Sequence, residues 1–217
     1  MLQERDVECI RGNHDAAAVG LMRPRRFSPP ARKAIRWTAR VLTAASRRFL
    51  AALPMVRLLD GRYVIVHGAL HPQPNDEVRI RQLEDARSSL EVLERDYSVA
   101  RVCFFGHTHR AGAFRIRRGA VSEIMDAQLH LDAGERWLVN PGSVGQSRDR
   151  DSRAAFIVYD ETSRTVRFHR VAYDRAAAQA KRERFGLVYR PHLARRAAWR
   201  IGHMVASAGS AIRGGAK

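Results

Sequence analysis

Short apolar runs in the first half of the chain predict buried strands. The runs are Val7–Arg11, Tyr63–Val66 and Val102–Phe105, and a glycine follows each of them within two residues. Runs of this length that end at a turn residue are typical of buried strands rather than helices. We therefore expect three strands that end at sharp turns.

Helical spacing occupies the segments between these runs. Apolar residues in Ala31–Leu53 predict two short helices that break near Thr43, and Glu77–Asp96 predicts a long amphipathic helix. The Pro- and Arg-rich segment Leu21–Pro30 predicts a loop.

The second half of the chain changes to consecutive β segments. Ala155–Tyr159 and Thr165–Val171 flank a polar turn and predict an antiparallel pair. Strands that first alternate with helices and then follow one another indicate an α/β domain with two layered sheets. Three further β segments are expected at Ala113–Ile116, Ala120–Met125 and Trp137–Val139.

After Tyr173 the chain becomes helical and basic. Asp174–Phe185 predicts a helix with Asp174 as its N-cap, and His192–Ala206 predicts a second basic helix. We expect one domain over residues 1–172 and a basic helical extension over residues 173–217.

The net charge of +17 is concentrated in two segments. Arg23–Arg48 holds nine basic residues and no acidic one, and the chain from Arg175 onward holds ten basic residues and one acid. Such segments attract polyanions such as nucleic acid, anionic lipid or phosphorylated substrates. The alternative is a solvated, Arg-rich surface without a partner.

The chain shows no sign of a membrane span or a secretory leader. No apolar run reaches 18 residues, and the N-terminus is too charged for a signal peptide. Cys9 and Cys103 lie in apolar runs, which fits reduced core thiols better than a disulfide. A cytoplasmic location is therefore expected.

Polar donor side chains follow all three buried runs directly. The segments are Gly12-Asn13-His14-Asp15, His67-Gly68 and Gly106-His107-Thr108-His109. Imidazoles and an amide oxygen suit divalent metals such as Zn, Mn, Fe, Co or Ni, and the glycines allow close backbone approach. In an extended segment, His107 and His109 would point to the same side. Because such strand ends collect at one edge of a sheet, we expect the donors to converge.

These three segments, in this order, resemble the later motifs of the calcineurin-like metallophosphoesterases, most closely the small bacterial and archaeal phosphodiesterase branch. Ala31–Pro54 and Asn140–Gln146 are similar to the same branch. The resemblance covers roughly residues 1–172 and implies a layered α-β-β-α sandwich with two mixed sheets. It also implies hydrolysis of phosphate mono- or diesters by two divalent transition-metal ions, with a phosphate ester or nucleotide as substrate.

The resemblance further implies roles for single residues. Metal ligands would be His109 for the first ion and, for the second, Asn13, His67 and His107. His14 would protonate the leaving oxygen or stabilise the charged transition state, with Asp15 orienting its ring. Alternatively, Asp15 only caps the helix that follows. Arg148 is a candidate phosphate contact, and the loop Asn140–Gln146 is expected to be structural.

Two earlier motifs of the family, D-x-H and G-D-x-x-D, do not occur in the sequence. In the family they supply the aspartate that bridges both ions, so we expect the chain to lack the family's N-terminal strands. Three interpretations are open: a start codon assigned too far downstream, completion by another chain, or an inactive remnant. In the last case the basic segments would bind nucleic acid or an anionic surface.

Overall fold

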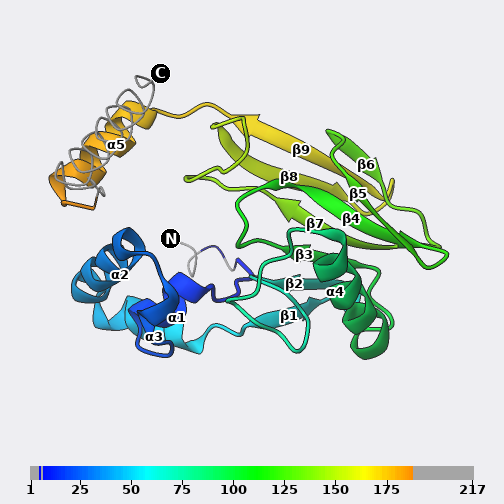
Figure 1. The fold of residues 1–217 in the computed structure, drawn as a ribbon, viewed down its shortest axis with the longest axis horizontal. Coiled ribbons are helices and arrows are strands. Elements are labelled where there is room, and N and C mark those ends of the chain that lie inside the picture. Colours follow the sequence, from blue (N-terminus) through cyan, green and yellow to red (C-terminus); the bar gives the residue numbers. More distant parts are fainter. Residues whose placement is uncertain (1–4, 6, 188–217) are drawn as a thin grey trace, which may run out of the picture.

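The computed structural model describes residue 5 and residues 7–187, which form two facing β-sheets with helices at one end and on one face (Figure 1). The helices are α1 Asn13–Ala18, α2 Pro29–Val41, α3 Ala44–Ala52, α4 Leu83–Asp96 and α5 Arg175–Arg184, with a 3-10 turn at Pro24–Arg26. The strands are β1 Val56–Leu59, β2 Tyr63–Val66, β3 Val102–Phe105, β4 Ala111–Arg117, β5 Ala120–Ile124, β6 Gln128–His130, β7 Arg136–Pro141, β8 Ala154–Asp160 and β9 Thr165–Val171.

The larger sheet has six strands in the order β1-β2-β3-β7-β4-β5. Its centre is parallel, because β3 pairs in parallel with both β2 and β7, whereas the outer pairs are antiparallel. The smaller sheet has the order β6-β9-β8 and is antiparallel throughout. The short turn between β8 and β9 explains their antiparallel pairing, because parallel strands need a much longer connection. The α/β sandwich with two sheets is confirmed, and only the larger sheet is mixed.

Alternating side chains place the central strands between two apolar cores. In β3, Cys103 and Phe105 face α4 and pack in one core with Leu93. Val102 of the same strand faces the smaller sheet and packs in the other core with Val166 of β9. Successive strand residues point to opposite faces, so both faces of β3 are buried and the end of the strand is rigidly held.

The helices α1, α2 and α3 gather at one end of the larger sheet, and α5 lies above α2 (Figure 1). Thr43 is the N-cap of α3, with its side chain accepting from the Ser46 amide. The break expected near Thr43 is therefore the start of a new helix. Asp174 caps α5 as predicted, by accepting from the Ala177 amide.

Some elements differ from the expectation. Residues 7–11 are extended but belong to no strand, because a strand needs a ladder of bonds to a neighbour; the Arg11 amide bonds to Pro54 O at 2.8 Å. The helix expected from Glu77 begins at Leu83, since the Asn75 side chain accepts from the Glu77 amide at 2.8 Å and holds a turn there. The short strands β1 and β6 were not expected.

The predicted helix His192–Ala206 lies outside the described residues. Within residues 7–187, no helix is long and apolar enough to cross a membrane.

Candidate metal centre

The ends of β2 and β3 bring two histidines to the same edge of the larger sheet. The strands are parallel, with Val66 opposite Phe105. His67 follows Val66 directly, and His107 follows Phe105 after Gly106, whose amide donates to the His67 carbonyl at 2.9 Å. The pairing therefore sets the two imidazoles side by side, with 5.0 Å between ring centroids.

Three donor atoms converge at the His67 ring. Its Nε2 lies 3.0 Å from Asn13 Oδ1 and 3.1 Å from His107 Nδ1. Asn13 is the first residue of α1, and both it and His107 are buried. Gly12 lies against the His67 ring, since an added Cβ would be 3.0 Å from its Nδ1. The three side chains expected to bind the second metal ion thus form one cluster.

The loop that carries His107 and His109 is a tight bend, so the expectation of an extended segment was wrong. Both histidines have positive φ, 59° and 61°. Residues other than glycine adopt this conformation only where surrounding contacts hold it. The buried Asn140 side chain holds the bend, because Nδ2 donates to Gly106 O at 2.8 Å and to Thr108 Oγ1 at 3.0 Å. The loop Asn140–Gln146 was expected to be structural, and holding this bend is such a role.

His109 lies on the wall of the same pocket, outside the donor cluster. Its Nδ1 is 2.8 Å from the Gln146 carbonyl oxygen. A carbonyl oxygen can only accept, so Nδ1 donates this bond and Nε2 is the ring nitrogen that remains for another partner. The Arg148 amide donates to the His109 carbonyl at 3.0 Å, which fixes the Arg148 loop beside the site. His109 is therefore left with Nε2 as a donor atom for a ligand.

Burial makes the two clustered histidines neutral at physiological pH. It lowers the pKa of His67 to about 4, against the opposing charge of Asp15. Burial also lowers the pKa of His107 to about 3, and the positive charges nearby, those of Arg79 and Arg148 included, act in the same direction. Neutral imidazole is the form that binds a metal ion.

The cluster fits one divalent metal ion. Among residues 7–187, no three His, Cys, Asp or Glu gather as a metal site, and the third donor here is the amide oxygen of Asn13. Two ligand atoms at right angles on an ion with bonds of about 2.1 Å lie about 3.0 Å apart, which is close to the separations in the cluster. His107 Nε2 is also buried without a hydrogen-bond partner in the described part of the chain. With no partner at Nε2, the clustered nitrogen Nδ1 is the His107 atom that faces the other two donors.

His14 and Asp15 follow Asn13 in α1 but have different surroundings. The His14 ring packs edge-on against Phe27, with 4.9 Å between centroids, and lines the pocket. Burial lowers the pKa of His14, and the Asp15 charge opposes this effect. Asp15 Oδ2 accepts from the Gly12 amide at 2.9 Å, which is the capping contact expected as its alternative role. Orientation of the His14 ring by Asp15 stays a prediction.

A family model described as the calcineurin-like phosphoesterase superfamily domain matches residues 1–164. The chain belongs to this superfamily. Membership implies metal-dependent hydrolysis of phosphate esters, which in this family typically uses two metal ions.

Individual relatives of this calcineurin-like phosphoesterase are similar over most of its length. The crystal structure of a metallophosphoesterase from Sphaerobacter thermophilus has 33% identity and a TM-score of 0.65, covering 82% of this chain and 71% of that one. An uncharacterized protein of Methanocaldococcus jannaschii is 28% identical over 183 residues, which are 82% of this chain and 70% of that protein. A hypothetical protein from Pyrococcus horikoshii OT3 shares the fold at 17% identity, with a TM-score of 0.63 and coverage of 86% and 71%.

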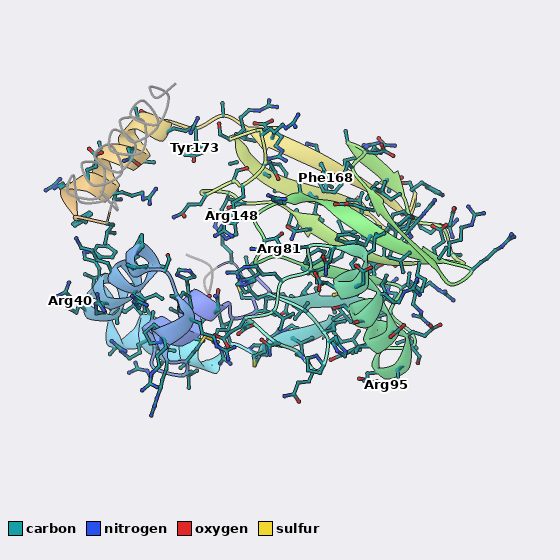
Figure 2. The ribbon with its side chains drawn as sticks, in the orientation of Figure 1. Arg40, Arg81, Arg95, Arg148, Phe168 and Tyr173 are labelled. Carbon is teal, nitrogen blue, oxygen red and sulfur yellow. The ribbon has the colours of Figure 1, made fainter. Side chains whose placement is uncertain are left out.

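In this member of the superfamily, Asn13, His107 and His109 line a pocket of about 600 Å³. Arg148 lines the pocket as well, on the side that faces the helices α1–α3 (Figure 2). Three further arginines of the wall, Arg26, Arg79 and Arg182, were not singled out from the sequence. They belong to no motif, and the 39 Lys and Arg residues of the chain hide any single functional one.

Proposed function

We propose that this chain hydrolyses phosphate mono- or diesters with a divalent transition-metal ion bound by Asn13, His67 and His107. The supporting observation is the convergence of two neutral imidazoles and an amide oxygen at separations of 3.0 and 3.1 Å. This donor set suits Mn, Fe, Zn, Co or Ni. His109 Nε2 is the donor offered to a second ion.

The chain's own residues bind and orient the phosphate. A bound divalent ion supplies a polarised phosphoryl oxygen and a water of lowered pKa as nucleophile. Arg148 lies close enough for its charge to lower the pKa of both His14 and His107. A guanidinium at this position attracts phosphate oxygens and offers them a fork of donors.

His14 is proposed to donate a proton to the leaving oxygen. Its ring lies in the pocket, and Phe27 packs against it and restricts its orientation. The Asp15 charge favours the protonated ring. A phosphate dianion that enters beside the ring would act in the same direction, so substrate binding prepares the acid.

Turnover of bis(p-nitrophenyl) phosphate with Mn²⁺ tests this function. His107→Ala removes one clustered imidazole and should lower the rate by roughly 100-fold or more. His130→Ala is the matched control, because His130 is an exposed residue of β6 beside Asp132. It should keep the parental rate. Equal rates for the parent and His107→Ala would contradict the proposal.

Calorimetric titration with Mn²⁺ separates metal binding from catalysis. The parent and His130→Ala should bind the ion, and His107→Ala should bind it at least about tenfold more weakly, since one of three donors is lost. If the parent protein binds Mn²⁺ in this way but shows no turnover, the proposed metal site stands and the proposed hydrolase activity is contradicted.

A further inference from the structure

The pocket above the metal cluster is completed by a helix that lies outside the sandwich. Arg182 of α5 and Leu187, shortly after the helix, line the same pocket as the metal donors Asn13 and His107. No residue of α5 is buried. A helix without buried residues gains little from packing along its length, so the contacts at its ends decide where it lies.

Contacts at both ends of α5 hold it over the pocket. Beyond the C-terminal end, the Phe185 ring lies 5.0 Å from the Trp37 ring of α2, measured between centroids. Before the N-terminal end, Tyr173 Oη donates to Gly145 O at 3.1 Å. Gly145 belongs to the loop that carries Arg148, and Figure 2 shows Tyr173 and Arg148 on this side of the sandwich.

Four arginines from separate segments line the pocket: Arg26, Arg79, Arg148 and Arg182. Arg26 lies 3.6 Å from Glu77, which also lines the pocket. The other three have no ion pair and no side-chain hydrogen bond within the described residues. Burial lowers the pKa of Arg79, and the charges of Arg81 and Arg148 lower it further. Four arginines therefore line this pocket, and among its described lining residues Glu77 is the one carboxylate.

Like charges that share one pocket repel each other, and an anion that binds among them relieves this repulsion. A metal-bound phosphate is already partly neutralised by the ion, so it does not need all four of these arginines. The others are free to bind further phosphate oxygens, which a planar guanidinium matches with two parallel hydrogen bonds. The apolar side chains of Phe27, Pro30 and Leu187 offer a wall for the organic part of the ligand.

We propose that this pocket selects substrates that carry two or more linked phosphates, and that α5 is a clamp that supplies Arg182 to the outer phosphates. The inference rests on the proposed hydrolysis at the metal cluster and names the substrate class of that site. It makes Arg182 a specificity-determining residue and Phe185 the residue that positions it.

Calorimetric binding of inorganic triphosphate and inorganic phosphate tests the clamp. Both titrations use the full chain in EDTA at one low ionic strength, so that chelation of metal by triphosphate does not contribute. The parent should bind triphosphate roughly tenfold or more tightly than phosphate, and Arg182→Ala should lose about tenfold of the triphosphate affinity. The matched control is Arg184→Ala, which removes the same charge from the same exposed helix outside the pocket.

Arg184→Ala should bind triphosphate as the parent does. Phe185→Ala should weaken triphosphate binding with an unchanged circular dichroism spectrum, because α5 then loses its contact with Trp37. Equal losses in Arg182→Ala and Arg184→Ala would reduce the effect to net charge and overturn the proposal. Equal affinity of the parent for phosphate and triphosphate would also overturn it. No turnover is measured, so failure here is distinct from failure of the hydrolase proposal.

Discussion

At the scale of single residues, His67 has little freedom to move. Asn13 and His107 contact Nε2 of its ring, and Gly12 lies against Nδ1, Cε1 and Cγ. An added Cβ at position 12 would lie 3.0 to 3.2 Å from three ring atoms, which is tighter than ordinary packing. The lack of a side chain at Gly12 therefore leaves room for the His67 ring, although Gly12 contributes no donor atom to the metal cluster.

Gly12→Ala should displace the His67 ring by a few tenths of an ångström and weaken Mn²⁺ binding by roughly tenfold, the effect expected when a neighbour that orients a ligand is altered. Gly134→Ala is the control, because an added Cβ there meets no atom within 4 Å. Calorimetry with Mn²⁺ provides the measurement. Identical affinities in the two variants would show that the ring is not constrained by Gly12.

The lowered pKa values of His67 and His107 predict a pH-dependent stability of the metal-free protein. Unfolded histidines have a pKa near 6.5, so the unfolded chain binds more protons as pH falls below that value, and stability falls with it. At 1.36 kcal/mol per pKa unit, the change from 6.5 to about 4 at His67 amounts to about 3 kcal/mol. Asp76 acts in the opposite sense, because burial raises its pKa from 3.8 to about 6.

Melting temperature in EDTA between roughly pH 4.5 and 7.5 measures this dependence. Replacing His67 by Asn removes one of the titrating groups, so the loss of stability toward acid should become shallower than in the parent. If both proteins lose stability equally as pH falls, the acid sensitivity comes from other groups.

At the scale of elements, α4 covers one face of the larger sheet and holds β2 and β3 in place. Leu93 of this helix is fully buried in the core that also contains Val66 and Phe105, the last residues of the two strands. Packing of the helix therefore supports the strand ends from which His67 and His107 follow. The metal cluster therefore depends on this core.

Leu93→Ala should lower the free energy of unfolding by about 2–5 kcal/mol, the usual cost of emptying a buried leucine site. Glu91→Ala lies on the exposed side of the same helix and should change it by less than about 0.5 kcal/mol. Urea unfolding followed by circular dichroism measures both. A small effect of Leu93→Ala would mean that α4 can leave the sheet without unfolding it.

At the scale of the whole molecule, the sandwich and the C-terminal helix are unequally tied together. Both sheets share a continuous core, whereas α5 buries none of its residues. Deletion of residues 174–217 should therefore leave the melting temperature within roughly 4 °C of the parent, and should abolish the preference for triphosphate over phosphate. Differential scanning calorimetry tests the first outcome. A large drop in melting temperature would show that the expected boundary near residue 172 does not separate two units.

The net charge of +17 also acts over the whole molecule. Binding of nucleic acid or an anionic surface by the basic segments stays a prediction, and it would weaken steeply as salt rises. Four of these positive charges are the arginines of the pocket, which come from separate segments that the fold brings together. We propose that they bind the phosphates of the substrate.

Local patterns were sufficient to predict the elements that lie in the core. β2 and β3 were expected at their observed bounds, and the pairing of β8 with β9 was also foreseen, because buried apolar runs and polar turns are encoded by neighbouring residues. The donor residues Asn13, His67 and His107 could be named because each follows such a run within two residues and because the segments resemble the family's motifs. The strand expected at residues 7–11 failed, because strand formation needs a partner that local pattern does not supply.

Residue order alone thus marks which side chains follow the buried runs and predicts that they meet at one sheet edge. Only the folded molecule decides how they meet. The parallel register of β2 and β3, the positive φ of His107 and the bonds from Asn140 set donor separations near 3 Å. Tertiary packing also brings Arg182, 75 residues after His107, to the same pocket. Such distances depend on contacts between segments far apart in the chain, and no short stretch of sequence encodes them.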